Sequence, residues 1–328
     1  LIRDEQHRSI PDQYETARET VRHLVDLIRT GVRVVLTHGS GPQMGFILRR
    51  SELALSEVSP IPMDYAGADL QGAIGVFDSG VGGLSVLRAI RQALPHETLV
   101  YVADSGHAPY GDKSSAHIVS RTLEVGRWLM ERGVRAITLA CNTATVVAVR
   151  ELREFAPVPV VAIEPAIKPA VSLSQRGVVG VLATQQTVQS AGVAHLIERF
   201  GQGAQILLQP CPGWVEQVEK GELETPRTLE LLREHTQPLI DAGADVWVLG
   251  CTHFPFLLPA LRRLAGPSVQ FIDPAQAVAR ELTRRLSQLE ATTPAGQGAE
   301  WFYTTGEVGA AQQVMSQLWE RPVEVLSL

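Results

Sequence analysis

From residue 73 onward, short continuous runs of apolar residues alternate with segments in which apolar residues recur every three or four positions. The continuous runs predict strands that are buried on both faces, and the periodic segments predict amphipathic helices. Strands that alternate with helices in this way are typical of parallel sheets covered by helices on both sides. The expected strand, loop and helix units occupy residues 73–90, 98–111, 133–152, 158–171, 177–184, 204–223, 244–264 and 269–286.

Two of these units carry near copies of one segment, LACNTAT and LGCTHFP. Cys141 follows the apolar run 136–140, and Cys251 follows the run 246–250, so each cysteine is expected just past the end of a buried strand. Hydroxyl, amide or imidazole groups come next, where a helix is expected to begin. The sequence therefore predicts two equivalent thiol sites in the two halves of an internal repeat.

Five polar loops are expected at the carboxyl ends of the strands: residues 78–83, 103–111, 141–145, 183–187 and 251–255. Open parallel sheets bind ligands at this edge, so the loops are expected to converge on one crevice. Helix N-termini in such loops suit a substrate that carries carboxylates. Ser79 is expected to be the N-cap of the helix that follows Gly82 and Gly83. The loop DSGVGG lacks the spacing of the dinucleotide and P-loop motifs, which argues against nucleotide binding.

Composition narrows the class of protein. The chain has 328 residues, 45% of them hydrophobic, and its net charge of −6 is scattered along the sequence, which argues against a nucleic-acid partner. No apolar stretch approaches the roughly 18 residues that a membrane span needs. The three cysteines lie far apart and away from clusters of histidine, so neither disulfides nor a metal site is expected, and the compartment is expected to be the cytoplasm.

Paired thiols suit one kind of chemistry. Inverting an α-carbon without a cofactor requires a base on one face and an acid on the other, and two cysteines from pseudo-symmetric halves meet that need. Asp78 and His253 are the neighbours expected to help each cysteine change its protonation state. None of the three lysines lies in a Schiff-base motif, so no cofactor is expected.

Six linked segments, GVFDSGVGGLSVLR, ADSGHAPYG, ACNTAT, EPAIKPA, CPGWVEQVEKGEL and GCTHFPFL, resemble those of the glutamate racemases in the cofactor-independent aspartate/glutamate racemase superfamily. The resemblance covers residues 74–328. It implies two similar α/β domains with the active site between them, one formed by residues 74–167 and 274–328 and the other by residues 168–273. It also implies interconversion of L- and D-glutamate, which supplies D-glutamate for peptidoglycan, and a homodimer.

The resemblance also implies a role for individual residues. Cys141 would take the Cα proton of D-glutamate with help from Asp78, and Cys251 that of L-glutamate with help from His253, while Glu219 matches a further acidic residue of the site. The residues expected to bind the substrate are Ser79, Pro109, Tyr110, Gly111, Asn142, Thr143, Thr187 and Thr252.

Other chemically notable residues receive no catalytic role. Cys211 has no mirror partner and is expected to be an inert core residue. His107 is assigned no function. Gly213 and Trp214 stand where the resembled family tends to have bulky apolar residues, and they are expected to reshape a nearby wall.

The first 73 residues resemble an N-terminal piece of carbamate kinase, of the amino-acid kinase family. The specific part is HGSGPQMG, in which Gly39, Gly41, Pro42 and Gln43 match a binding loop. The remainder of a kinase is missing, so no complete kinase site is expected. Because Ile74 and Gly75 serve both patterns, a chimera produced by recombination, frameshift or assembly is one explanation, and a regulatory extension is the other.

The sequence leaves three functions open. The first is a glutamate racemase, the second is a racemase for aspartate or a hydantoin, and the third is a non-catalytic fusion protein whose cleft only holds an acidic amino acid.

Overall fold

The computed structural model describes residue 70, residues 72–289 and residues 298–328. The kinase-like residues Gly39 to Gln43 lie outside the described residues, so that interpretation stays a prediction. The compact unit begins at Leu70. Leu70 and Ala73 are buried in the core, and the Gly72 N–H donates to the Gly133 carbonyl at 2.8 Å.

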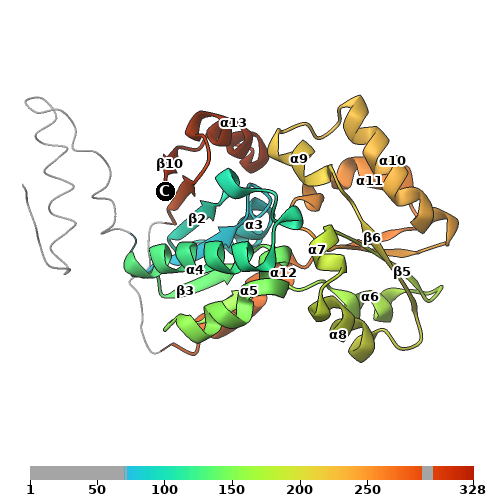
Figure 1. The fold of residues 1–328 in the computed structure, drawn as a ribbon, viewed down its shortest axis with the longest axis horizontal. Coiled ribbons are helices and arrows are strands. Elements are labelled where there is room, and N and C mark those ends of the chain that lie inside the picture. Colours follow the sequence, from blue (N-terminus) through green and yellow to red (C-terminus); the bar gives the residue numbers. More distant parts are fainter. Residues whose placement is uncertain (1–69, 71, 290–297) are drawn as a thin grey trace, which may run out of the picture. The chain divides into compact units, whose positions relative to one another are not determined.

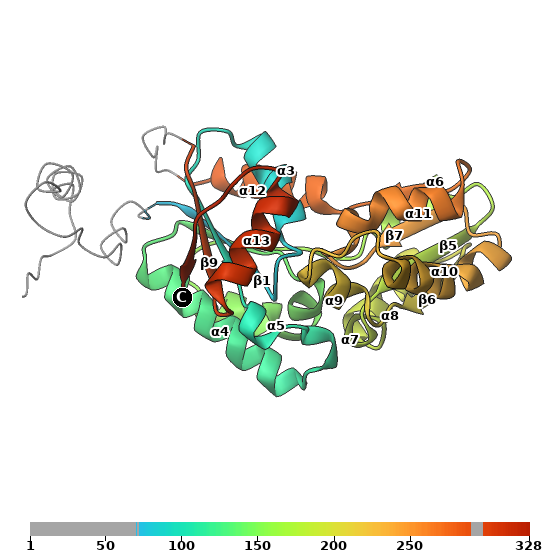
Figure 2. The same cartoon turned by 90° about the horizontal axis from the view of Figure 1, so that it is seen from above.

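One sheet has six parallel strands in the order β10-β9-β2-β1-β3-β4. Its strands are β1 (Ile74–Asp78), β2 (Leu99–Ala103), β3 (Ala136–Leu139), β4 (Val160–Ala162), β9 (Glu300–Thr304) and β10 (Val325–Ser327). One face is covered by α4 (Ser115–Glu131) and α5 (Asn142–Phe155), and the other by α3 (Leu84–Ala93), α12 (Ala275–Leu286) and α13 (Val308–Trp319) (Figures 1 and 2). The buried runs therefore form central strands, as their continuous apolar pattern predicts.

The other sheet has four parallel strands in the order β6-β5-β7-β8. They are β5 (Val178–Ala183), β6 (Gln205–Pro210), β7 (Val246–Leu249) and β8 (Gln270–Ile272). Helices α6 (Ile167–Leu173) and α8 (Ala191–Phe200) pack on one face, and α10 (Pro226–Asp241) and α11 (Leu258–Ala265) on the other. Two short helices, α7 (Gln185–Val188) and α9 (Trp214–Glu219), come after β5 and β6 in the chain.

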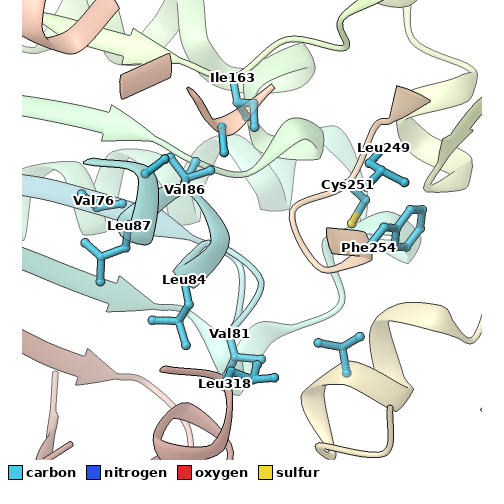
Figure 3. Close-up of a cluster of buried hydrophobic side chains, with 14 of the residues drawn as sticks. Val76, Val81, Leu84, Val86, Leu87, Ile163, Leu249, Cys251, Phe254 and Leu318 are labelled. Carbon is cyan, nitrogen blue, oxygen red and sulfur yellow. The ribbon is translucent and has the colours of Figure 1, made fainter. Parts of the chain in front are cut away.

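The two sheets repeat one arrangement. Strands β2-β1-β3-β4 and β6-β5-β7-β8 have the same order, and each cysteine of the repeat comes after the third strand of its half with a single intervening residue. The predicted α/β fold with two pseudo-symmetric parallel sheets is confirmed. One apolar cluster extends across both halves, from Val76 and Leu87 to Leu249 and Phe254 (Figure 3).

The two thiol sites differ in the helix that comes next in the chain. Helix α5 begins at Asn142, directly after Cys141, whereas Cys251 is followed first by the 3₁₀ helix η4 (Phe254–Leu257) and only then by α11. Pro255 and Pro259 lie in the first turns of η4 and α11, where a missing N–H is tolerated. The expectation of two equivalent helix starts is therefore wrong in this detail.

The N-cap expected for Ser79 is also wrong. Helix α3 begins at Leu84, its N-cap is Gly83, and no side chain caps it. The Ser79 hydroxyl instead donates to Asp78 and accepts from the thiol of Cys141. Because the serine lies five residues before the helix, its side chain turns into the site.

Candidate active site

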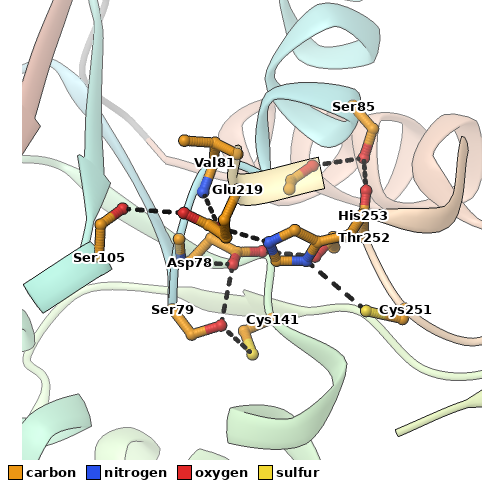
Figure 4. Close-up of polar contacts among 12 residues, drawn as sticks. Asp78, Ser79, Val81, Ser85, Ser105, Cys141, Glu219, Cys251, Thr252 and His253 are labelled. Carbon is orange, nitrogen blue, oxygen red and sulfur yellow. Dashed lines mark hydrogen bonds and ion pairs between the residues drawn. The ribbon is translucent and has the colours of Figure 1, made fainter. Parts of the chain in front are cut away.

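Cys141 is the N-cap residue of α5 and is almost fully buried, with 4% of its surface exposed. Its Sγ accepts from the Ala144 N–H at 3.4 Å. The thiol donates to Ser79 Oγ at 3.4 Å (Figure 4). Burial, followed by the nearby charge of Asp78, raises the pKa of the Cys141 thiol to about 12. This residue is therefore a protonated thiol at neutral pH.

Asp78 joins the two halves of the molecule. Its Oδ1 accepts from Ser79 Oγ at 3.2 Å and from the Gly80 N–H at 3.0 Å, and its Oδ2 accepts from Thr252 Oγ1 at 2.7 Å. Complete burial raises the pKa of this carboxyl, although His253 and these hydrogen bonds act in the opposite direction. Asp78 is therefore connected to Cys141 through Ser79 and to the Cys251 loop through Thr252.

Cys251 belongs to a second set of connected polar contacts. Its Sγ lies 3.6 Å from His253 Nδ1, and His253 Nε2 lies 2.6 Å from Glu219 Oε1. Burial lowers the pKa of His253, but the hydrogen bonds with Cys251 and Glu219 outweigh it and raise the pKa well above the ordinary value. The ring is thus an imidazolium that faces the second thiol.

Three threonine hydroxyls form a closed group beside Cys141. Thr143 Oγ1 lies 3.0 Å from Thr184 Oγ1 and 3.3 Å from Thr187 Oγ1, and the latter two lie 3.0 Å apart. Thr184, which was not predicted from the sequence, is the N-cap of α7 and accepts from the Thr187 N–H. Its capping position in the segment TQQT is the signal that points to it.

Asn142 presents an unused amide. Among the residues that the structure describes, neither its Nδ2 nor its Oδ1 has a hydrogen-bond partner, although both atoms are buried. Buried amides are normally satisfied, so this one is available to a ligand that binds between the loops.

Buried hydrogen bonds to Asp104 hold the segment from Pro109 to Gly111 in place. Tyr110 is buried, and its hydroxyl donates to Asp104 Oδ2 at 2.6 Å; burial, the charge of Asp104 and this hydrogen bond all raise the pKa of the phenol. Arg121 reaches the same carboxylate with two nitrogens at 3.0 and 2.8 Å. Gly111 lies against Thr184, so that a Cβ at this position would lie 3.1 Å from Thr184 Cβ. Asp104 and Arg121 were not among the residues predicted from the sequence.

The remaining chemically notable residues lie beside this site. His107 Nδ1 is 3.1 Å from Asp104 Oδ1. Cys211 is buried in the same apolar cluster as Cys251, and its thiol donates to the Gln209 carbonyl at 3.4 Å. Trp214 packs edge-on against Phe254 with the ring centroids 4.8 Å apart, next to Gly213 in the left-handed region at φ 83°.

Within the described ranges no cluster of three or more histidine, cysteine or acidic side chains is arranged to hold a metal ion. The part of the chain that the structure covers also contains no helix with the length and apolar character that crossing a bilayer requires.

Fold and site together define an α/β protein with paired, separately supported thiols at equivalent strand ends. Residues 74–282 match the Asp/Glu/Hydantoin racemase family. The chain belongs to this family.

Relatives share most of the described part of the chain. Glutamate racemase of Methylococcus capsulatus is 51% identical over 247 residues, which are 75% of this chain and 91% of the relative. The structure of Escherichia coli glutamate racemase in complex with L-glutamate and the activator UDP-MurNAc-Ala is similar with a TM-score of 0.72 and 35% identity, over 78% of this chain and 97% of that one. The Francisella tularensis glutamate racemase in complex with D-glutamate has a TM-score of 0.68 and 27% identity, over 79% and 98% of the two chains.

Proposed function

We propose that this protein interconverts L-glutamate and D-glutamate by a two-base mechanism with no cofactor. One observation carries the proposal: two buried thiols lie after equivalent strands of a repeated sheet, and each has its own polar partners. A protein that only held an acidic amino acid would not need a thiol supported by an imidazole and a carboxylate. The glutamate racemases that this chain is similar to supply the substrate class.

In the direction from L- to D-glutamate, Cys251 acts as the base. Its thiolate, next to the His253 imidazolium, takes the Cα proton, and the Cys141 thiol delivers a proton to the opposite face of the carbanion. Cys141 suits the acid role because its raised pKa keeps it protonated. After one turnover Cys251 holds the proton and Cys141 is a thiolate.

In the opposite direction Cys141 must lose its proton to act as the base. The hydrogen bonds from Cys141 to Ser79 and from Ser79 to Asp78 lead that proton to a carboxylate whose pKa is raised. Asp78 therefore accepts the proton when D-glutamate is the substrate. This assigns the two helpers to opposite half-reactions, Asp78 to Cys141 and His253, held by Glu219, to Cys251.

The substrate is held by groups around the two thiols. The amino group and α-carboxylate are bound by Ser79, Asn142, Thr143, Thr187 and Thr252, and the side-chain carboxylate by the segment from Pro109 to Gly111. The unpartnered Asn142 amide and the N-terminus of α5 support this assignment. The Tyr110 hydroxyl is already bonded to Asp104, so it holds the loop, and the backbone of Gly111 faces the substrate. These fixed donors stabilise the developing carbanion.

The proposed racemase also has two domains with defined boundaries. Residues 74–167 and 274–328 form one domain and residues 168–273 the other, with support from the two strand orders. The chain acts in the cytoplasm as a homodimer and supplies D-glutamate for peptidoglycan, the role that the family resemblance implies.

Chiral chromatography of the reaction mixture tests the proposal. The protein is incubated separately with L-glutamate, D-glutamate and L-aspartate. The two glutamate reactions are expected to reach the same equal mixture of enantiomers, while aspartate reacts more slowly. Aspartate as the faster substrate would favour the aspartate racemase alternative, and no conversion of any substrate would favour the non-catalytic one.

Single alanine variants complete this test. Cys141→Ala and Cys251→Ala are each expected to reduce racemisation at least about 1000-fold, because either change removes one of the two bases. Cys211→Ala, which removes an equally buried thiol, is the matched control and keeps its activity. Turnover by either of the first two variants at the rate of the control would contradict the two-base assignment.

A further inference from the structure

The loop after β1, residues 79–83, reaches from the six-stranded sheet to the Cys251 side of the site. We call it the glycine loop. The Val81 N–H donates to Glu219 Oε1 at 2.7 Å. The same oxygen binds His253 Nε2 at 2.6 Å (Figure 4). One carboxylate oxygen thus forms hydrogen bonds with a backbone amide from one half of the repeat and with an imidazole from the other.

The glycine loop is rigidly anchored on its own side. Tyr101 Oη donates to the Gly80 carbonyl at 2.5 Å, and the Gly80 N–H donates to Asp78 Oδ1 at 3.0 Å. The Val81 side chain is buried in the apolar cluster near Leu318 (Figure 3). These contacts therefore fix the direction of the Val81 N–H independently of Glu219.

Gly80 and Gly82 are needed for this contact. A Cβ at position 80 would lie 1.9 Å from Glu219 Oε1, and a Cβ at position 82 would lie 2.3 Å from His253 Nδ1 and 2.6 Å from two further ring atoms. Both glycines lie outside the left-handed region, so alanine fits the backbone at both positions. The close approach of the Glu219 and His253 side chains excludes a larger residue at these two positions.

Gly83 has a different neighbour. A Cβ there would lie 2.6 Å from Asp78 Cβ, the tightest contact, and 3.0 Å from both Asp78 Oδ2 and Tyr101 Oη. Gly83 is also in an ordinary helical conformation, with φ −61°. The neighbouring glycines of one loop therefore face the helper residues of the two different cysteines.

We propose that the glycine loop is a positioning element that serves both half-reactions: Gly80, Val81 and Gly82 set the Glu219–His253 pair for Cys251, and Gly83 sets Asp78 for Cys141. This inference rests on the proposed racemase function. None of these four residues carries an ionisable or nucleophilic side chain. Each acts through a side chain that the loop holds in place, and a displacement of about 1 Å in such a side chain lowers a rate about 100-fold.

Substrates deuterated at Cα separate the two halves of the reaction. The Cys251 step breaks the Cα–H bond of L-glutamate, and the Cys141 step breaks that of D-glutamate. A variant that slows only one step makes that step limit the rate, so its primary isotope effect on kcat/KM rises while the effect on the other enantiomer falls. A general loss of stability or of substrate binding does not produce this opposite change.

The experiment compares Gly82→Ala with Gly83→Ala in the full chain. Gly82→Ala is expected to slow turnover about 100-fold, to raise the isotope effect on L-glutamate and to lower that on D-glutamate. Gly83→Ala is expected to do the reverse. Gly192→Ala, on an exposed turn of α8 where the new Cβ makes only ordinary contacts of 3.5 Å or more, is the matched control and leaves both isotope effects unchanged.

A second variant covers the case in which Gly82→Ala does not fold. Glu219→Asp keeps the charge but shortens the side chain, so one carboxylate oxygen no longer reaches both Val81 and His253. It is expected to show the same change as Gly82→Ala, with the higher isotope effect on L-glutamate.

The outcomes separate this inference from the proposed function. A wild-type protein that forms no D-glutamate would overturn the function itself. A wild-type protein that racemises glutamate, together with glycine-loop variants or Glu219→Asp in which both isotope effects change equally or not at all, would overturn the positioning role and leave the function standing.

Discussion

Removing the charge of Asp78 is expected to make the Cys141 thiol easier to ionise while making the enzyme slower. In Asp78→Asn the oxygen that accepts from Ser79 and Gly80 is kept, and the new amide can donate to Thr252, so the hydrogen-bond geometry survives. The change therefore acts mainly on the charge. Two hydrogen bonds of 3.4 and 3.2 Å separate the thiol from the carboxylate, so the two charges lie within about 7 Å of one another.

The size of the effect comes from this distance. With a pKa of about 12, roughly one Cys141 in 10,000 is a thiolate at pH 8. Two unit charges about 7 Å apart repel each other by about 2 kcal/mol at an effective dielectric constant near 20. Removing that repulsion raises the thiolate fraction by at least about tenfold. Turnover is expected to fall by about 100-fold, because the new amide cannot accept the proton that Cys141 must lose.

Alkylation by iodoacetamide at pH 8 measures the thiolate directly. The three cysteines fall in separate tryptic peptides, residues 136–150, 200–220 and 234–262, so mass spectrometry follows each one independently. The labelling rate of Cys141 in Asp78→Asn is compared with its rate in the wild type, in which this cysteine is 4% exposed.

The matched control is Asp245→Asn. This buried carboxylate accepts from Ser174 and from two backbone amides of the following turn, and it has no contact with a thiol. It is expected to leave the labelling of Cys141 unchanged. Slower or unchanged labelling of Cys141 in Asp78→Asn, or undiminished turnover in that variant, would refute the electrostatic reasoning.

Two further predictions concern stability and the extent of the active unit. Arg121→Met is expected to destabilise the fold by about 3–5 kcal/mol at pH 7 in urea unfolding, because it leaves Asp104 buried without its charged partner, and to raise KM by loosening the Tyr110 loop. Although burial acts to raise the pKa of Asp104, its hydrogen bonds with Arg121, Tyr110 and Thr305 hold that pKa below the ordinary value. The stability that this lowered pKa provides is present above about pH 4 and is lost as pH falls through the lowered pKa. The free energies of unfolding of the wild type and Arg121→Met are therefore expected to converge in acid. A difference between them that stays constant with pH would contradict this. Residues 70–328 alone are expected to racemise glutamate at the rate of the full chain, since every described site residue lies within them, and a large loss in a chiral assay would show that the first 69 residues contribute to the site.

The order of elements and the place of the site could be predicted because both depend on local pattern. Continuous apolar runs predict buried parallel strands, and such strands place their following loops at one edge of the sheet. Cys141 and Cys251 could therefore be assigned to equivalent strand ends from the sequence alone.

The partner of each polar side chain could not be predicted, since it depends on contacts between distant segments. Serine is a residue type that favours the N-cap position, yet the Ser79 side chain forms hydrogen bonds with Asp78 and Cys141 instead. Arg121 has the sequence character of an ordinary helical cation, and only the packing of α4 beside the β2 loop brings it to Asp104. Glycine-rich composition alone likewise does not reveal that Gly82 faces the ring of His253.

The fate of the Cα hydrogen in D₂O tests the central claim most directly. If two thiols act on opposite faces, D-glutamate formed from L-glutamate carries deuterium at Cα from the first turnover, while the remaining L-glutamate keeps its protium. Mass spectrometry of the separated enantiomers at early times measures both. Product that retains the original hydrogen would mean that a single group carries the proton from one face to the other, and the account built on Cys141 and Cys251 would be wrong.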